Sequence, residues 1–474
     1  MKKLLFIILL LHTFGFSQTT YVPDDNFEQA LIDEGYDDAL DDSVLTADIS
    51  GITSLDVSHD SISDLTGIED FTALMYLNCQ HNDLTSLDVS NNTALTVLSC
   101  QHNDLTSLNV NTNTALTELS CSNNQLTSLD VSTNIALTFL SCGDGNQLTS
   151  LNVSSNTVLT ELHCANNQLT SLDVSANTAL TDLTCSDNQL TSLDVSANTA
   201  LTYLSCSSNP LTSLDVSANT ELYYLNCGNN QLTSLDVSAN TALTDLSCAN
   251  NQLTSLDVSN NTALIVLICW SNQLTSLDVS NNTALVYMDC SGNQLTTLDV
   301  SSNTAFIGLV CSYNQLSYLD MSNGVTDAFE IFIATDNSLT CIETLDSEYA
   351  TANWTYANGN IDEGVTFAEN CSQVSIDAEI IPLKFQLHNA YPNPFNPVTT
   401  LRYDLPENSV VNIVVFDMMG REVRTLINQT QNAGHQSVVW DATNDYGKPV
   451  SAGIYLYQIQ AGEYISTKKM VLLK

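Results

Sequence analysis

Twelve of the fourteen cysteines recur along the chain at intervals of 21 residues, with one step of 22. Spacing this regular marks an array of structural repeats. A single coil of such an array cannot bury its own apolar side chains, so its stability comes from stacking, and both ends need caps. The twelve ladder cysteines are Cys79, Cys100, Cys121, Cys142, Cys164, Cys185, Cys206, Cys227, Cys248, Cys269, Cys290 and Cys311.

One repeat, residues 180–200, contains the pattern Leu-x-x-Leu-x-(Cys or Val)-x-x-Asn twice. The alternation of Leu183 with Cys185, and of Leu193 with Val195, predicts two short strands in each coil with these side chains inside. An asparagine follows each strand at a corner, where its side-chain amide can satisfy backbone groups of the adjacent coil. Each coil is therefore expected to consist of two half-coils.

This pattern resembles the leucine-rich repeat, whose Leu-x-x-Leu-x-Leu-x-x-Asn-x-Leu signature is matched here with Cys in the third apolar place. The match covers residues 52–340, and its first coils look like the 22-residue repeat of internalin-type proteins. The resemblance implies an α/β-solenoid of leucine-rich repeats, mostly β, with about 14 coils and two short strands per coil. The extra residue in Gly143-Asp144-Gly145 is expected to bulge one corner without shifting the strands.

The cysteines divide into two classes. Parallel strands lie ~4.8 Å apart, whereas a disulfide needs Cβ atoms ~3.8 Å apart, so the ladder cysteines are predicted to be buried free thiols. Cys341 and Cys371 stand outside the ladder, and in an exported chain we expect them to form a disulfide. They bracket the predicted C-terminal cap, 341–371. The predicted N-terminal cap, 18–51, includes a short helix.

The charge of the chain is very uneven. There are 53 Asp and Glu against 10 Lys and Arg, a formal net charge of -43, and no Lys or Arg lies between Lys3 and Lys384. Binding to phosphate backbones rests on clustered Lys and Arg, so this composition excludes nucleic-acid binding. Lys2 and Lys3 precede an apolar run, which predicts a secretory signal peptide over residues 1–17. That run is too short to span a bilayer, and no transmembrane segment is expected in the mature chain.

The two half-coils differ in how much they vary between repeats. The Ser-Leu-Asp-Val-Ser half is nearly monotonous, whereas the outward positions of the other half vary. Aromatic residues mixed with acids are typical of a recognition surface, and the resemblance implies that this strand lines the binding face. The alternative is repeat drift without selection. The candidate binding face consists of Tyr76, Phe139, Glu161, His163, Asp182, Tyr203, Tyr224, Asp245, Trp270 and Tyr287.

The monotonous half places one Asp per coil in an outward row. Carboxylates stacked at this spacing repel one another, so Ca²⁺ is a candidate ligand, and solvated acids that keep the chain soluble are the alternative. The candidate Ca²⁺ ligands are Asp194, Asp215, Asp236 and Asp257. A small metal site formed by His81 and His102 with Asp83 and Asp104 is a further hypothesis. No other cofactor is expected.

No arrangement of nucleophile, base and orienting residue and no Gly-rich phosphate loop is recognisable in the sequence, so we expect a protein that is not an enzyme.

From residue 385 onward, short alternating strands separated by turn signals predict a small all-β immunoglobulin-like sandwich. The motifs Tyr-Pro-Asn-Pro-Phe-Asn-Pro at 391–397, Asp-Met-Met-Gly at 417–420 and Ser-Ala-Gly-Ile-Tyr at 451–455, with the terminal Lys-Lys-Met-Val-Leu-Leu-Lys, closely resemble a type A sorting domain of the type IX secretion system. The motif residues are Tyr391, Pro392, Asn393, Pro394, Phe395, Gly420, Gly453, Tyr455 and Lys474.

That resemblance implies export by the signal peptide and then by the type IX machinery, with cleavage in the linker 372–384 and delivery to the cell surface or the medium. The sequence therefore predicts a secreted or surface leucine-rich-repeat binding protein, such as an adhesin, that recognises a protein or glycan. The competing hypothesis is a passive or Ca²⁺-stiffened structural solenoid without a specific ligand.

Overall fold

The computed structural model describes residues 18–371, 382 and 384–473, and the chain divides into two compact units at Cys371 and Ser372. The predicted signal peptide, most of the predicted linker and Lys474 lie outside the described residues. Among the described residues, no helix combines the length and the apolar character needed to cross a membrane. The two units are described separately.

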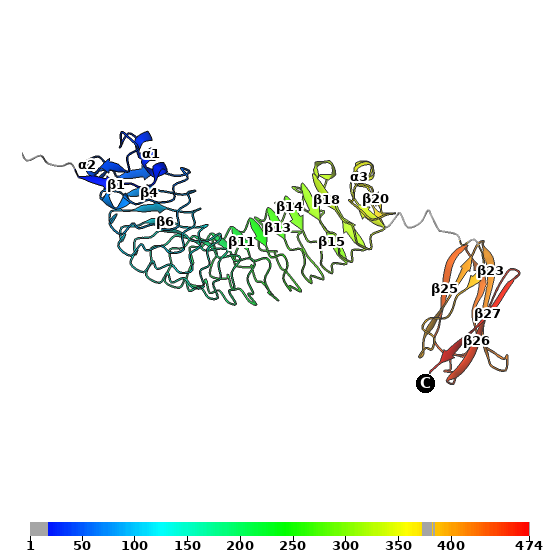
Figure 1. The fold of residues 1–474 in the computed structure, drawn as a ribbon. Coiled ribbons are helices and arrows are strands. Elements are labelled where there is room, and N and C mark those ends of the chain that lie inside the picture. Colours follow the sequence, from blue (N-terminus) through cyan, green and yellow to red (C-terminus); the bar gives the residue numbers. More distant parts are fainter. Residues whose placement is uncertain (1–17, 372–381, 383, 474) are drawn as a thin grey trace, which may run out of the picture. The chain divides into compact units, whose positions relative to one another are not determined.

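The first unit contains a 14-stranded parallel sheet with one three-residue strand from each coil. Each strand pairs in register with its neighbour and turns a buried central side chain inward. Figure 1 shows this sheet along the concave side of the stacked coils. The predicted solenoid and its first strand are confirmed. The strands are β3 (Ser54–Asp56), β4 (Tyr76–Asn78), β5 (Val97–Ser99), β6 (Glu118–Ser120), β7 (Phe139–Ser141), β8 (Glu161–His163), β9 (Asp182–Thr184), β10 (Tyr203–Ser205), β11 (Tyr224–Asn226), β12 (Asp245–Ser247), β13 (Val266–Ile268), β14 (Tyr287–Asp289), β16 (Gly308–Val310) and β18 (Ile331–Ile333).

The second predicted strand forms only in the last coils. There, β15 (Thr297–Asp299), β17 (Tyr318–Asp320), β19 (Cys341–Glu343) and β20 (Thr366–Ala368) make a four-stranded parallel sheet. In the preceding coils the residue before the buried Leu is Ser, whereas β15 and β17 begin with Thr and Tyr, which favour strands. The buried Leu side chains are 7–9% exposed from Leu87 to Leu277 but 1% exposed at Leu298. The prediction of two strands per coil is therefore wrong for most coils, which pack less closely on this side.

Two columns of buried asparagines join the coils. Asn188 donates from Nδ2 to the carbonyl oxygens of Cys164 (3.1 Å) in the preceding coil and Cys185 (3.2 Å) in its own coil. Its Oδ1 accepts the backbone N–H of Leu169 at 2.9 Å. In the second column, Asn198 donates to two carbonyl oxygens of the preceding coil, at 3.0 and 2.8 Å. The predicted role of these amides at the corners is confirmed.

The 22-residue step is accommodated at a corner, as predicted. Leu140 and Leu162 on β7 and β8 stay in register across it. Gly143 lies so close to the next coil that an added Cβ would be 2.6 Å from the carbonyl oxygen of Ala165. Gly145 has a φ of +107°, a conformation that favours glycine. The insertion therefore alters the turn and leaves the sheet unchanged.

The N-terminal cap is built around the helix α1 (Asp25–Asp33). Asp24 precedes it and accepts the backbone N–H groups of Asn26 and Phe27, which stabilises the first turn. Phe27 and Leu31 are fully buried against the first coils. The remaining elements of the cap region are β1 (Thr19–Tyr21), β2 (Ser43–Leu45), α2 (Thr46–Ile49) and the 3₁₀ helix η1 (Ile68–Asp70).

Aromatic side chains cover the last coils. Trp354, which follows α3 (Ser347–Asn353), packs against Phe332 with ring centroids 4.3 Å apart and against Phe367 at 5.8 Å. A short 3₁₀ helix, η2 (Thr326–Ala328), precedes this region. Tyr356, in contrast, is 63% exposed and contributes little to the covering of the core.

The cysteines have two environments in this unit. All twelve ladder thiols are free and buried. Burial raises the pKa of the Cys206 thiol to about 12, so it behaves as a small apolar side chain. Cys341 and Cys371 are joined by a disulfide, with Cα atoms 5.7 Å apart.

The second unit is an all-β sandwich, as predicted. One sheet has the order β21-β22-β25 and the other β24-β23-β26-β27. Buried residues including Tyr403, Trp440 and Tyr457 form its core. The Glu-Val-Arg-Thr-Leu-Ile-Asn-Gln-Thr-Gln sequence of β24 has no regular apolar alternation that would predict a strand. The strands are β21 (Gln386–Leu387), β22 (Thr399–Leu405), β23 (Ser409–Asp417), β24 (Glu422–Gln431), β25 (Gly434–Trp440), β26 (Gly453–Ala461) and β27 (Tyr464–Leu472).

Candidate binding faces

The large sheet brings four residues of the candidate face into one row. Asp182, Tyr203, Tyr224 and Asp245 are the first residues of β9 to β12 and pair with one another in register. The rings of Tyr203 and Tyr224 are parallel within 2°, with centroids 4.2 Å apart. All four residues are partly exposed. The row therefore places a stacked aromatic pair between two carboxylates.

His163, the third residue of β8, lies beside the N-terminal end of this row. Its Nε2 lies 3.4 Å from Asp182 Oδ1 and 4.0 Å from Glu161 Oε2. Its ring centroid is 5.4 Å from that of Phe139. Hydrogen bonding to Asp182 is the main cause of a raised His163 pKa, and partial desolvation opposes it. The imidazole thus links aromatic and acidic residues from three adjacent coils.

The remaining residues of the candidate face lie apart from this group. Tyr76 is on β4, three strands before Phe139. Tyr287 is on β14 and lies over Gly308, where an added Cβ would be 2.6 Å from the tyrosine ring. Trp270 lies beyond the end of β13, at a corner and partly buried.

Several exposed apolar residues next to the row were missed in the sequence analysis. The position before each strand is usually threonine, as at Thr202, whose Oγ1 donates to the carbonyl oxygen of Thr181 at 3.1 Å. Tyr223, Ile265 and Ile307 replace threonine there and are 47%, 42% and 40% exposed. The replacement of a repeated threonine by an apolar residue was the sequence signal that could have identified these positions. They add apolar surface to the C-terminal half of the sheet.

The aspartate row of the monotonous half has a structural role in its own turns. Asp194 Oδ1 accepts the backbone N–H of Ser196 at 2.9 Å. Hydrogen bonding to Ser196, first through its hydroxyl, lowers the Asp194 pKa. The same backbone bond recurs at Asp215, Asp236 and Asp257. Ca²⁺ binding by this row stays a prediction.

Three histidines stack along one corner of the first coils. The ring of His81 lies 4.3 Å from that of His59 and 4.1 Å from that of His102, nearly parallel to both. Partial desolvation, followed by the two neighbouring rings, lowers the His81 pKa. Within the described part of the chain, no group of three or more His, Cys, Asp and Glu is arranged to hold a metal ion.

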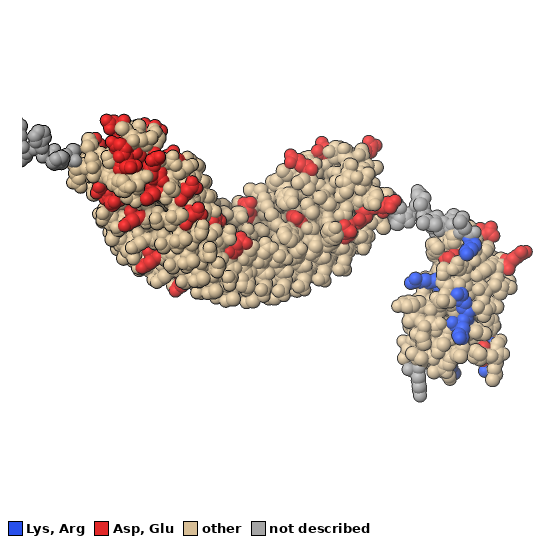
Figure 2. All heavy atoms as spheres, in the orientation of Figure 1, with Lys and Arg blue, Asp and Glu red and all other residues tan. Residues whose placement is uncertain are grey.

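The two units differ in charge as the sequence indicates. On the face in Figure 2, acidic side chains gather over the N-terminal cap and the first coils, and Lys and Arg are seen only on the second unit. Because no Lys or Arg lies between Lys3 and Lys384, no such side chain of the solenoid neutralises its acids. Its field attracts cations and repels anions.

In the second unit, two distant motifs of the predicted sorting domain meet. Asn393 Oδ1 accepts the backbone N–H of Val471 at 2.9 Å, and its Nδ2 donates to the carbonyl oxygen of Lys469 at 3.2 Å. Phe395 is buried and pairs through its backbone with Val471 and Leu473. The 391–397 segment is therefore attached to β27.

The other motif residues are dispersed. Tyr391 is 73% exposed, and Tyr455 donates its hydroxyl to the carbonyl oxygen of Ser451 at 2.6 Å. Gly420 and Gly453 have φ values of +75° and +159°. Gly420 therefore has the left-handed backbone of a tight turn between β23 and β24.

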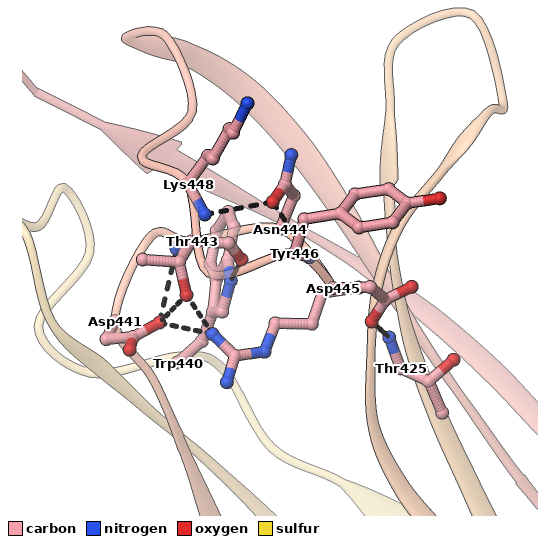
Figure 3. Close-up of polar contacts among 9 residues, drawn as sticks. Thr425, Trp440, Asp441, Thr443, Asn444, Asp445, Tyr446 and Lys448 are labelled. Carbon is pink, nitrogen blue, oxygen red and sulfur yellow. Dashed lines mark hydrogen bonds and ion pairs between the residues drawn. The ribbon is translucent and has the colours of Figure 1, made fainter.

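A loop between β25 and β26 presents an exposed aromatic side chain from a well-bonded frame. Trp440 Nε1 donates to the carbonyl oxygen of Thr443 at 3.0 Å, and Asp445 Oδ1 accepts the backbone N–H of Thr425 on β24 at 3.0 Å. Figure 3 shows Tyr446 pointing away from these contacts. Its side chain is 88% exposed.

The known proteins that this chain resembles have the same kind of repeat. Residues 199–240 match the family described as leucine-rich repeats (2 copies). A solved structure described as the functional domain of InlJ from Listeria monocytogenes, including a cysteine ladder, is 29% identical, with a TM-score of 0.63, and covers 96% of this chain and 99% of that one. The chain is a leucine-rich-repeat protein. Its solenoid is internalin-like and carries a cysteine ladder.

Two other comparisons support the leucine-rich-repeat fold. Internalin J of L. monocytogenes serotype 4b (strain F2365) is 38% identical over 72 residues, which are 15% of this chain and 8% of that protein. The solved structure of a leucine-rich-repeat protein of Leptospira interrogans is 23% identical, with a TM-score of 0.57. The match covers 67% of this chain and 85% of the Leptospira chain. The latter likeness concerns the fold alone. The proteins named here are described as internalins and as a leucine-rich-repeat protein.

The second unit has a separate relative. Residues 397–463 match the family described as the FlgD Ig-like domain. This match agrees with the two antiparallel sheets of the leucine-rich-repeat protein's C-terminal unit.

Proposed function

We propose that the chain is a secreted or surface-displayed binding protein that recognises a protein or glycan through the outward face of its large sheet, and that it is not an enzyme. The observation that carries this proposal is the row in which Tyr203 and Tyr224 stack between Asp182 and Asp245. Aromatic side chains held on a rigid sheet supply large contact area at little entropic cost, and aromatic residues are enriched at interfaces.

The contrast between the half-coils supports this assignment. The aspartates of the monotonous half are bonded to their own turns, so their repetition has a structural explanation. The outward residues of the large sheet have no comparable shared role and vary from coil to coil. Variation confined to one face is what recognition of a specific partner requires, although repeats in one chain also drift.

The proposal can be tested by adhesion of the predicted mature chain, residues 18–474. Surfaces that retain the wild-type protein are identified first, and retention of the variants on them is then measured. We expect Tyr203→Thr/Tyr224→Thr to reduce retention strongly, since threonine keeps the strand and removes both rings. Asp215→Asn/Asp236→Asn is the control in the opposite half-coil. Equal retention of all three proteins would exclude the sheet as the binding face.

We further propose that the second unit is a type IX sorting domain and that it directs the solenoid across the outer membrane. The contact between the 391–397 segment and β27 supports this, because both carry motifs of that domain and hydrogen bonds join them. The well-bonded loop that presents Tyr446 offers a second contact point for a partner.

Export tests this second proposal. Asn393→Ala removes both bonds to β27, so we expect the protein to accumulate in the periplasm, as it should when residues 385–474 are deleted. Asn428→Ala, at an exposed position of β24, is the matched control and should be exported normally. Normal surface delivery of the deletion variant would refute the assignment.

A further inference from the structure

The row Asp182-Tyr203-Tyr224-Asp245 has a geometry that selects the charge of its ligand. Because the two rings stack on each other across adjacent strands, each ring has one face covered by the other ring, and the strand on its other side begins with Asp182 or Asp245. At ~4.8 Å per strand, the four residues span ~14 Å. The row therefore contains two places, each flanked by a tyrosine ring and a carboxylate on adjacent strands.

Both groups that bound each place attract cations. The face of an aromatic ring carries negative electrostatic potential, and a carboxylate adds a full negative charge. Each carboxylate also has a polar group of the chain beside it. Asp245 Oδ2 accepts the hydroxyl of Thr244 at 2.7 Å, and Asp182 Oδ1 lies 3.4 Å from His163 Nε2.

We propose that this row binds a basic segment of a protein partner, with arginine side chains seated against the two tyrosines and paired with Asp182 and Asp245. This inference rests on the proposed function of the sheet and names the chemistry of its partner. The absence of Lys and Arg between Lys3 and Lys384 supports it, since the field of the whole solenoid favours a cationic ligand and disfavours phosphate or acidic glycans.

The choice of arginine follows from the tyrosines. A guanidinium group is planar, stacks on aromatic faces and forms two parallel hydrogen bonds to a carboxylate, whereas an ammonium group is a strongly hydrated point charge. A cationic polysaccharide, the alternative ligand, is a polymer of a basic amino sugar and carries only ammonium groups. A protein segment rich in arginine therefore fits the row better than a cationic polysaccharide.

Binding of fluorescein-labelled hexa-arginine to the mature chain, measured by anisotropy at fixed salt, tests the proposal. We expect Asp182→Asn/Asp245→Asn and Tyr203→Thr/Tyr224→Thr each to weaken binding about tenfold. Hexalysine and a glucosamine hexamer should bind the wild-type chain more weakly than hexa-arginine. A cooperative thermal transition in each variant would show that it is folded.

The matched control is Asp215→Asn/Asp236→Asn, which removes the same two charges from the other half-coil. Asn109 and Asn152 already occupy this position and accept the same backbone bond, at 3.1 and 3.0 Å, so the control keeps its turns. We expect it to change the affinity less than about twofold. Equal weakening by the control and the row variants would mean general charge attraction and would overturn the site.

Two other results would also overturn the inference: no saturable binding of hexa-arginine, or equally tight binding of the glucosamine hexamer. Adhesion separates this failure from failure of the proposed function. If hexa-arginine does not compete with the wild-type chain for its surface, while the tyrosine variant still loses adhesion, the sheet is the binding face but its partner is not an arginine-rich protein.

Discussion

Asn209 Oδ1 accepts the backbone N–H of Leu190, in the preceding coil, at 3.0 Å. The same side chain donates to the carbonyl oxygens of Cys185 and Cys206. The Asn209 amide thus pairs with a backbone N–H and with carbonyl oxygens that are buried at the turn. Asn219, in the second column, donates to two carbonyl oxygens of the preceding coil, while its Oδ1 has no hydrogen-bond partner among the described residues.

Asn209→Ala should therefore destabilise the solenoid more than Asn219→Ala. The first change leaves a buried N–H and several carbonyls unpaired and should cost about 2–4 kcal/mol, and the second about 1–2 kcal/mol because it also removes an unsatisfied oxygen. Urea unfolding of the two variants measures the difference. Equal losses would contradict the distinct roles of the two columns.

The ladder thiols should be unreactive in the folded protein. Burial raises the pKa of the Cys164 thiol to about 12, as it does for Cys206, so little thiolate forms at neutral pH and reagents have no access. Counting thiols with a chromogenic disulfide reagent should give almost none in buffer and about twelve after denaturation. Rapid reaction in buffer would show that the ladder is open to solvent.

The disulfide should stabilise the end of the solenoid. Cys341 and Cys371 are 30 residues apart, and closing a loop of that length contributes about 3.6 kcal/mol in the chain-entropy treatment. Cys341→Ser/Cys371→Ser should lower the thermal midpoint, and a reductant should lower that of the wild type to a similar degree. The variant itself should not respond to reductant, which is the internal control.

His163 should make stability depend on pH. Its pKa is raised in the folded state, chiefly by hydrogen bonding to Asp182, so its contribution is full below the unfolded pKa of about 6.5 and is lost as pH rises through the folded pKa. Partial exposure keeps the contribution within about 1 kcal/mol. His163→Gln should thus lower stability at pH 5.5 and have little effect at pH 9, and a uniform effect would exclude this ion pair as the cause.

Divalent cations test the aspartate row. One oxygen of Asp215 and of Asp236 is already bonded to a serine N–H, so we expect Ca²⁺ to raise the thermal midpoint only by screening, as Mg²⁺ does at the same concentration. Calorimetry with each ion measures this. A saturable rise specific to Ca²⁺ and lost in Asp215→Asn/Asp236→Asn would instead establish a Ca²⁺ site.

The interior of the solenoid was predictable because its periodicity is a direct consequence of packing. Leu183 and Cys185 alternate with outward residues, and each recurs at the same place in the next coil, so the first strand and the stacking followed from the sequence. The second strand did not, because Ser-Leu-Asp-Val-Ser has the same alternation without β-favouring residues on its outer side. Thr297 and Tyr318 supply them, and there the strand forms.

The positions of the candidate face could be predicted from the sequence, but the contacts between their side chains could not. The period of 21 residues places Tyr203 beside Tyr224, but their parallel stacking depends on side-chain rotamers that the sequence does not specify. Tyr223 is exposed but precedes its strand, and only positions within or after the strands were considered for the candidate face. The 391–397 segment and β27 are joined by tertiary contacts that no local pattern indicates.

The lack of Lys and Arg in the solenoid also bears on proteolysis. Enzymes of the trypsin type cleave after Lys or Arg, and none lies between Lys3 and Lys384. Within residues 18–474, such a protease can therefore cut only at Lys384 or at the Lys and Arg residues beyond it, all of which belong to the second unit. In a protease-rich environment, digestion would therefore trim away the C-terminal sandwich and leave the curved sheet and its aromatic row as one intact fragment.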